Sequence, residues 1–114
     1  MERFPAWLVA VLLLSACSSG SSKTATLILD NPTWDRVNVQ AVITTSADCD
    51  NRGNGYVETK EFVMTKGHPE RIETSHGEAV CWRHDRNPKD PVPGVWSGWS
   101  KVQLVPGQTA ETDL

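Results

Sequence analysis

The feature that most limits how this chain can fold is a period-two alternation of apolar and polar residues, broken at short intervals by turn-forming residues. The clearest stretch is residues 37–44, where every second residue is Val, Ala or Ile. Successive side chains of a β-strand point to opposite faces, so this alternation indicates a strand with one face in a core. No window of about eleven residues combines a helical period with capping residues. The pattern therefore predicts an all-β domain.

Seven strands are expected, at residues 25–29, 37–44, 56–64, 71–74, 79–85, 99–105 and 109–114. Turn residues that tolerate a positive φ or fix φ separate them, at residues 31–32, 52–55, 66–67, 76–77 and 106–107. Short strands with turns at this spacing predict a single antiparallel β-sandwich with an immunoglobulin-like strand order. The 114-residue chain is long enough for one such domain with its own core.

The N-terminus has a different composition. An uninterrupted apolar run at residues 6–14 follows a short polar segment that contains Arg3. The run is much shorter than the ~20 apolar residues that a membrane-spanning helix needs, but it suits the apolar part of an export signal. Leu14, Ser15, Ala16 and Cys17 come next, in that order. This tetrapeptide resembles the lipobox of bacterial lipoproteins.

The lipobox resemblance implies a location and an anchor. In that family the cysteine thiol receives a diacylglyceryl group, the preceding bond is cut, and the new amine is acylated, commonly with palmitate. Residues 1–16 are then a signal helix that is removed, residues 17–23 a Ser- and Gly-rich tether, and residues 24–114 the β-sandwich domain. Ser18, which is not Asp, implies sorting to the outer membrane, facing the periplasm. The expected partner at Cys17 is the membrane, through the lipid.

Two cysteines remain beyond the lipidation site. In an oxidising compartment Cys49 and Cys81 are expected to form a disulfide, with two free thiols as the alternative. Closing a loop of about 30 residues would contribute roughly 3–4 kcal/mol. In an immunoglobulin-like order, the two cysteines face each other within the sandwich, and loops 48–55 and 87–95 emerge at the same end.

Residues 79–104 carry a second resemblance. An Arg-bearing strand, a Pro- and Gly-rich loop and the motif WSGWS resemble the last two strands of a fibronectin type III domain. In cytokine receptors of that fold, such tryptophans interleave with arginines of the neighbouring strand. The resemblance implies a cation–π ladder in which Trp96 and Trp99 stack with Arg83 or Arg86. It also leaves open that these residues form a partner surface.

Other motifs are weak. Asp48 and Asp50 begin like a calcium loop, but Arg52 and Thr59 occupy positions where ligands are needed. His68, His76 and His84 have no metal-ligand spacing. No nucleophile lies in a recognised catalytic motif. We therefore expect no catalytic residues, no metal and no cofactor.

Composition and motifs together favour binding over chemistry. A formal net charge of −3 and the lack of a basic run argue against nucleic acid as a partner. The sequence predicts a lipid-anchored cell-envelope protein with a structural or protein-interaction role. Its expected partner is another envelope protein. The alternative is a small-ligand or glycan-binding module, because exposed tryptophans can stack on sugar rings. Exposed, coplanar indoles would favour the glycan; buried indoles would favour the structural role.

Overall fold

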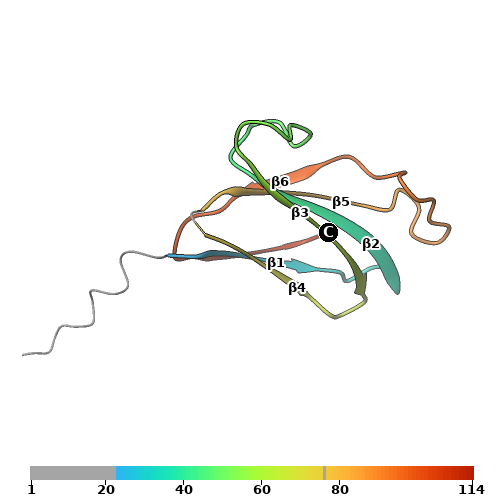
Figure 1. Cartoon of the computed structure of the whole chain (residues 1–114). Coiled ribbons are helices and arrows are strands. Elements are labelled where there is room, and N and C mark those ends of the chain that lie inside the picture. Colours follow the sequence, from blue (N-terminus) through green and yellow to red (C-terminus); the bar gives the residue numbers. More distant parts are fainter. Residues whose placement is uncertain (1–22, 76) are drawn as a thin grey trace, which may run out of the picture.

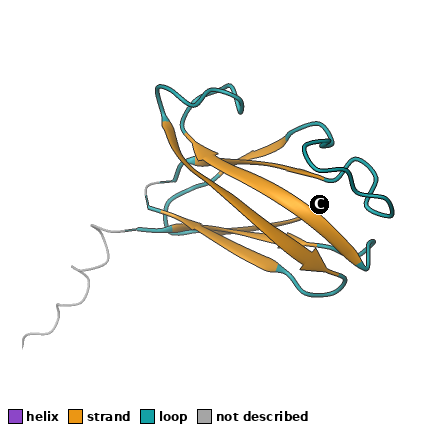
Figure 2. Cartoon of the chain, turned by 45° about the vertical axis from the view of Figure 1, so that its right-hand side comes forward, coloured by secondary structure: helices purple, strands orange, loops and turns teal. Residues whose placement is uncertain are grey.

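The computed structural model describes residues 23–75 and 77–114, which form two β-sheets packed face to face (Figures 1 and 2). The strands are β1 (Ala25–Asp30), β2 (Arg36–Thr44), β3 (Tyr56–Thr65), β4 (Glu70–Thr74), β5 (Ala79–His84), β6 (Ser100–Gln103) and β7 (Thr109–Asp113). No helix occurs among these residues. The all-β prediction is confirmed, and the largest boundary error is at the end of β6.

One sheet has three strands in the order β4-β1-β7, and the other has four in the order β3-β2-β5-β6. The core lies between them, where the apolar sets predicted by the alternation meet. Its fully enclosed side chains come mainly from β1 and β2: Ala25, Leu27, Leu29, Val37, Val39, Ala41 and Ile43. Met64, Ile72, Val80, Trp82 and Leu104 complete it. The period-two pattern therefore identified the inward faces.

The end of β2 is buried on both faces. Its first residues alternate between buried and at least partly exposed, whereas its last four, residues 41–44, are all buried. Val42 points away from the main core and packs in a second, smaller cluster with Cys49 and Cys81. This cluster exists because the connection after β2 folds back over the outer face of the four-stranded sheet.

The immunoglobulin-like strand order fits only roughly, and the expectation of a fully antiparallel sandwich is wrong. β7 pairs with β1 in parallel, with Thr26 opposite Thr109 and Asp30 opposite Asp113. The physical reason is the crossover at residues 104–108. The chain leaves β6 at the end of the molecule where β1 begins, so it enters the other sheet in the direction of β1.

The expected placement of the two long loops is also wrong. In the β2–β5 pair, Thr44 lies opposite Ala79 and Val39 opposite His84. The loop after β2 therefore starts where β5 begins, whereas the 85–99 connection starts where β5 ends. The two loops lie at opposite ends of the four-stranded sheet, as Figure 1 shows. Lys23 lies at the end where β5 begins, because Ala25 pairs with Thr74 just before β5.

Candidate functional site

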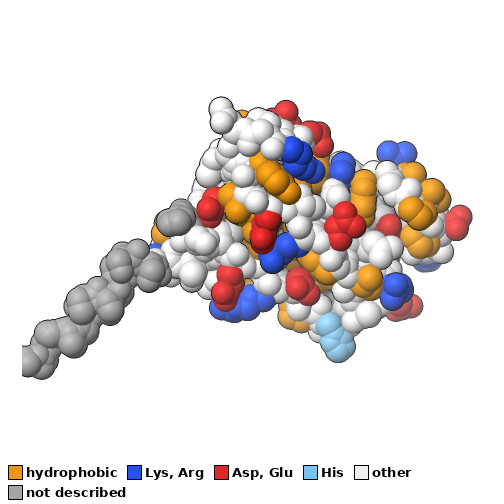
Figure 3. Space-filling model, viewed as in Figure 1, with side chains coloured by type: hydrophobic (Ala, Val, Ile, Leu, Met, Phe, Trp, Pro, Cys, Tyr) orange, Lys and Arg blue, Asp and Glu red, His pale blue; other side chains and the backbone are white. Residues whose placement is uncertain are grey.

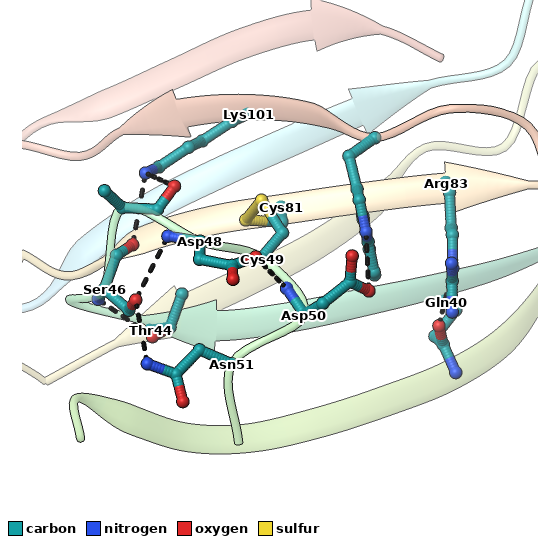
Figure 4. Close-up of a disulfide and its surroundings, with 12 residues drawn as sticks. Gln40, Thr44, Ser46, Asp48, Cys49, Asp50, Asn51, Cys81, Arg83 and Lys101 are labelled. Carbon is teal, nitrogen blue, oxygen red and sulfur yellow. Dashed lines mark hydrogen bonds between the residues drawn. A yellow bond between two sulfur atoms is a disulfide. The ribbon is translucent and has the colours of Figure 1, made fainter. Parts of the chain in front are cut away.

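A disulfide fastens the loop at residues 45–55 to the outer face of the four-stranded sheet (Figure 4). Cys49 and Cys81 are bonded with their Cα atoms 6.0 Å apart, so the expected disulfide is confirmed. It does not link the two sheets, as an immunoglobulin-like order would require. β2 and β5 are neighbours in one sheet, and the loop turns back from the end of β2 to reach β5.

Non-covalent contacts hold the same loop. The Lys101 ammonium donates to the carbonyl oxygens of Ser46 and Ala47 at 3.2 and 3.3 Å (Figure 4). The Trp99 indole N–H donates to Asp50 Oδ1 at 3.1 Å. Both donors belong to the segment that enters and forms β6, so the loop is bound to the last strand of the sheet as well as to β5.

Asp48 and Asn51 use their side-chain oxygens in turns of this loop. Asp48 Oδ1 accepts from the Asp50 backbone N–H at 2.9 Å, and Asn51 Oδ1 accepts from the Gly53 N–H at 2.7 Å. Among the residues that the structure describes, no group of three or more His, Cys, Asp or Glu side chains could hold a metal ion.

Arg83 lies between the two tryptophans of the WSGWS motif. Its guanidinium carbon is 4.1 Å from the Trp99 ring centroid and 5.5 Å from the Trp96 ring centroid. Its Nε donates to Gln40 Oε1 at 2.8 Å, which fixes the guanidinium plane on the sheet (Figure 4). Arg86 is exposed beyond the end of β5, and the arginine that stacks on both indole rings is Arg83.

This geometry gives the tryptophans an intramolecular role. Both indoles are half-buried, and the guanidinium occupies a face of each. Trp82 lies inside the core and is only 5% exposed. A sugar-stacking platform needs free indole faces, so the arrangement favours a structural ladder over glycan binding.

The histidines are dispersed. His84 Nδ1 lies 2.7 Å from the Asp85 carbonyl oxygen, and its ring packs against Trp34 at a centroid distance of 4.7 Å. His68 is exposed in the turn between β3 and β4. His76, like Cys17 and the whole expected signal and tether up to residue 22, lies outside the described residues.

The connection between β5 and β6, residues 85–99, is stiff. Its tip contains Pro88, Pro91 and Pro93, whose rings fix φ. Gly94 has a φ of 82°, and the Val95 N–H donates to the Val92 carbonyl at 3.0 Å, which makes a Pro-Gly turn of type II. An isolated bridge between Asp85 and Trp96 closes the base of the connection.

A groove of about 470 Å³ separates this connection from β3. Its apolar lining includes Val63, Pro91, Pro93 and Trp96, and its charged lining consists of Glu61 and Asp85. The groove is not predictable from the sequence, in which Asp85 is expected only as the last residue of a strand. The sequence shows only that an apolar strand pattern ends at an acidic residue. The groove itself depends on which strands pair, and the local pattern does not encode this pairing.

Surface charge is mixed on the face that Figure 3 shows, with acidic and basic side chains interspersed among apolar ones. That view contains no continuous basic area. Within the part of the chain that the structure describes, no helix has the length and apolarity needed to cross a membrane.

Comparison with known proteins identifies a shared fold. No protein-family model matches the chain, and no curated protein matches it. The crystal structure of the T6SS lipoprotein TssJ1 from Pseudomonas aeruginosa is similar, with a TM-score of 0.50 and 17% sequence identity. The similarity covers 81% of this chain and 87% of that one. The chain is thus a small two-sheet β-sandwich, and a lipoprotein is among the proteins of similar fold.

Proposed function

We propose that this chain is a non-catalytic lipoprotein of the bacterial cell envelope that docks another envelope protein. The anchor is the acylated Cys17, after removal of residues 1–16, and the location is the outer membrane, facing the periplasm. Residues 17–23 form the tether, and residues 24–114 the docking domain. The Leu14–Cys17 motif supports the anchor, and the lipoprotein neighbour supports the class. The Cys49–Cys81 disulfide is typical of an oxidising compartment.

The observation that carries the docking role is the position of the stiff 85–99 connection. It lies at the end of the sandwich opposite Lys23, where the tether enters the fold (Figure 1). Proline rings and the type II turn already order this segment, so it loses little conformational entropy when a partner binds. Val92 at its tip is 52% exposed. A tethered domain with such a segment presents it away from the membrane.

The type of assembly that we propose for this chain is based on the structurally similar lipoprotein TssJ1. That protein is a T6SS lipoprotein, and we extend the assignment to this chain: a lipoprotein subunit of a T6SS-type envelope assembly. The absence of catalysis is part of the same proposal. Its support is the use of the loop carboxylates, Arg83 and both indoles in contacts within the fold.

Replacing residues 87–95 with a short Gly/Ser linker tests the docking role. The variant should keep its melting curve and its membrane partitioning, because this connection lies outside both sheets. Partner capture by chemical crosslinking in intact cells should be lost. Capture at the wild-type level by a folded variant would place the docking surface elsewhere and refute the proposal.

A further inference from the structure

The groove beside the proline-rich connection has apolar walls and two carboxylates that form no ion pair with any described residue. Val63, 42% exposed on β3, forms one wall, and Pro91, Pro93 and Trp96 form the other. Asn38 and Val39 of β2 also line the groove. The lining contains no Lys, Arg or His. An apolar channel with only negative charges suits a ligand that is both apolar and cationic.

Asp85 is the main reason to assign a cationic ligand. Asp85 is only 4% exposed, yet within the described residues it has no ion pair. Its Oδ2 accepts from the Asn38 backbone N–H at 2.8 Å and from Asn38 Nδ2 at 3.0 Å. Its Oδ1 accepts no hydrogen bond from any described residue. The carboxylate is hydrogen-bonded through one oxygen only, and the other oxygen is not enclosed, so it can accept from an external cation.

Glu61 adds a second positioned carboxylate. Its Oε2 accepts from Gln40 Nε2 at 2.9 Å, and Gln40 in turn accepts from Arg83. The ladder that holds the two indoles therefore also orients the groove's outer carboxylate. Glu61 has no ion pair with any residue in the described ranges.

We propose that this groove binds an extended segment of the partner protein that carries Arg or Lys next to proline or an aliphatic residue. The cationic head lies between Asp85 and Glu61, and the aliphatic stem and neighbouring apolar residue pack on Val63 and Trp96. Aromatic-lined grooves with rigid walls are well suited to extended, proline-containing peptides, which lose little entropy on binding. This inference rests on the proposed docking function and adds the chemistry of the bound segment.

Peptide selection on the whole protein, expressed from its full-length gene and purified in detergent, tests this chemistry. A random-peptide display library should yield binders enriched in Arg or Lys beside Pro, Leu or Val. The strongest binder is then labelled, and its Kd is measured by fluorescence anisotropy. Failure to select any binder, or binders without a cationic residue, would overturn the proposal.

Isosteric variants locate the contact. Asp85→Asn keeps an oxygen for Asn38 but removes the charge, so affinity for the selected peptide should fall about tenfold. Glu61→Gln should lower it about threefold, because that carboxylate is exposed. Glu58→Gln is the matched control: Glu58 is an exposed acid of β3, lies outside the groove lining and should change affinity less than twofold. Equal affinity for Asp85→Asn and wild type, with both folded, would refute the groove assignment.

Two further measurements separate the possible outcomes. Free spermidine should not displace the peptide at matched charge concentration; equal displacement would mean that the groove takes a bare polycation, contrary to the proposal. In cells, Asp85→Asn should reduce crosslinked capture. Unchanged capture with Asp85→Asn, combined with loss on replacement of residues 87–95, would refute the groove while leaving the proposed docking end intact.

Discussion

Reduction of the Cys49–Cys81 disulfide should lower stability by a predictable amount. The bond joins residues 32 apart in sequence, and loop entropy in the unfolded chain gives about 3–4 kcal/mol for a loop of this length. For a domain of this size, that corresponds to a fall in melting temperature of about 15–25 °C. The fold itself should persist at 25 °C, because the main core between the two sheets does not include either cysteine. Circular dichroism with and without a phosphine reductant measures both effects.

A double variant supplies the control. Cys49→Ala with Cys81→Ala should melt at or below the temperature of the reduced protein, since it also removes a fully buried sulfur at Cys81. Its melting temperature should not respond to reductant. An oxidised wild type that melts within ~2 °C of its reduced form would show that the loop is held by its other contacts, at Asp50 and Lys101, and would refute the entropic account.

Three further outcomes are expected. Cys17→Ser should abolish palmitate labelling and leave an uncleaved or soluble precursor; membrane partitioning identical to wild type would contradict the anchor. Arg83→Gln should destabilise the domain by about 1–2 kcal/mol in urea unfolding, because it empties the space between two indoles; a loss within the ~0.5 kcal/mol of ordinary surface changes would contradict the ladder. A hydrogen bond to Asp30, and the charge of that carboxyl, raise the pKa of Glu111. This pair stabilises the fold below the ordinary value of 4.5 and loses that effect as the pH rises through the raised pKa. Glu111→Gln should therefore raise the melting temperature at pH 7 but not at pH 3, and an equal gain at both values would contradict the assignment.

Local patterns predicted the strands because period-two alternation and turn residues are short-range signals. The buried face of β2, for example, is visible in the sequence at Val37 and Val39. Strand pairing is not local, and the errors lie there. The parallel β1–β7 pair and the opposite placement of the two loops follow from how the chain crosses between sheets at residues 104–108, which alternation does not encode.

In the candidate site, too, local features could be predicted from the sequence and features that depend on strand pairing could not. The cysteine count was sufficient to expect the Cys49–Cys81 bond, but its position within one sheet depends on β2 and β5 being neighbours. The fibronectin-like motif pointed to Arg83 or Arg86, and the structure distinguishes them by the contacts of Arg83 with both rings and its hydrogen bond to Gln40 on the next strand. Asp85 could be predicted only as the last residue of a strand, because its burial and open oxygen depend on the turn that follows β5.

Site-specific photocrosslinking in living cells tests the central claim most directly. Two valines of nearly equal exposure, Val92 at 52% and Val105 at 51%, lie at opposite ends of the sandwich. A photoreactive phenylalanine at position 92, on the proline-rich connection, should give a discrete crosslinked product with an envelope protein. The same residue at position 105, near the tether, should give none. A product at position 105 but not at 92, with both variants folded and membrane-bound, would contradict docking through the end opposite the lipid anchor.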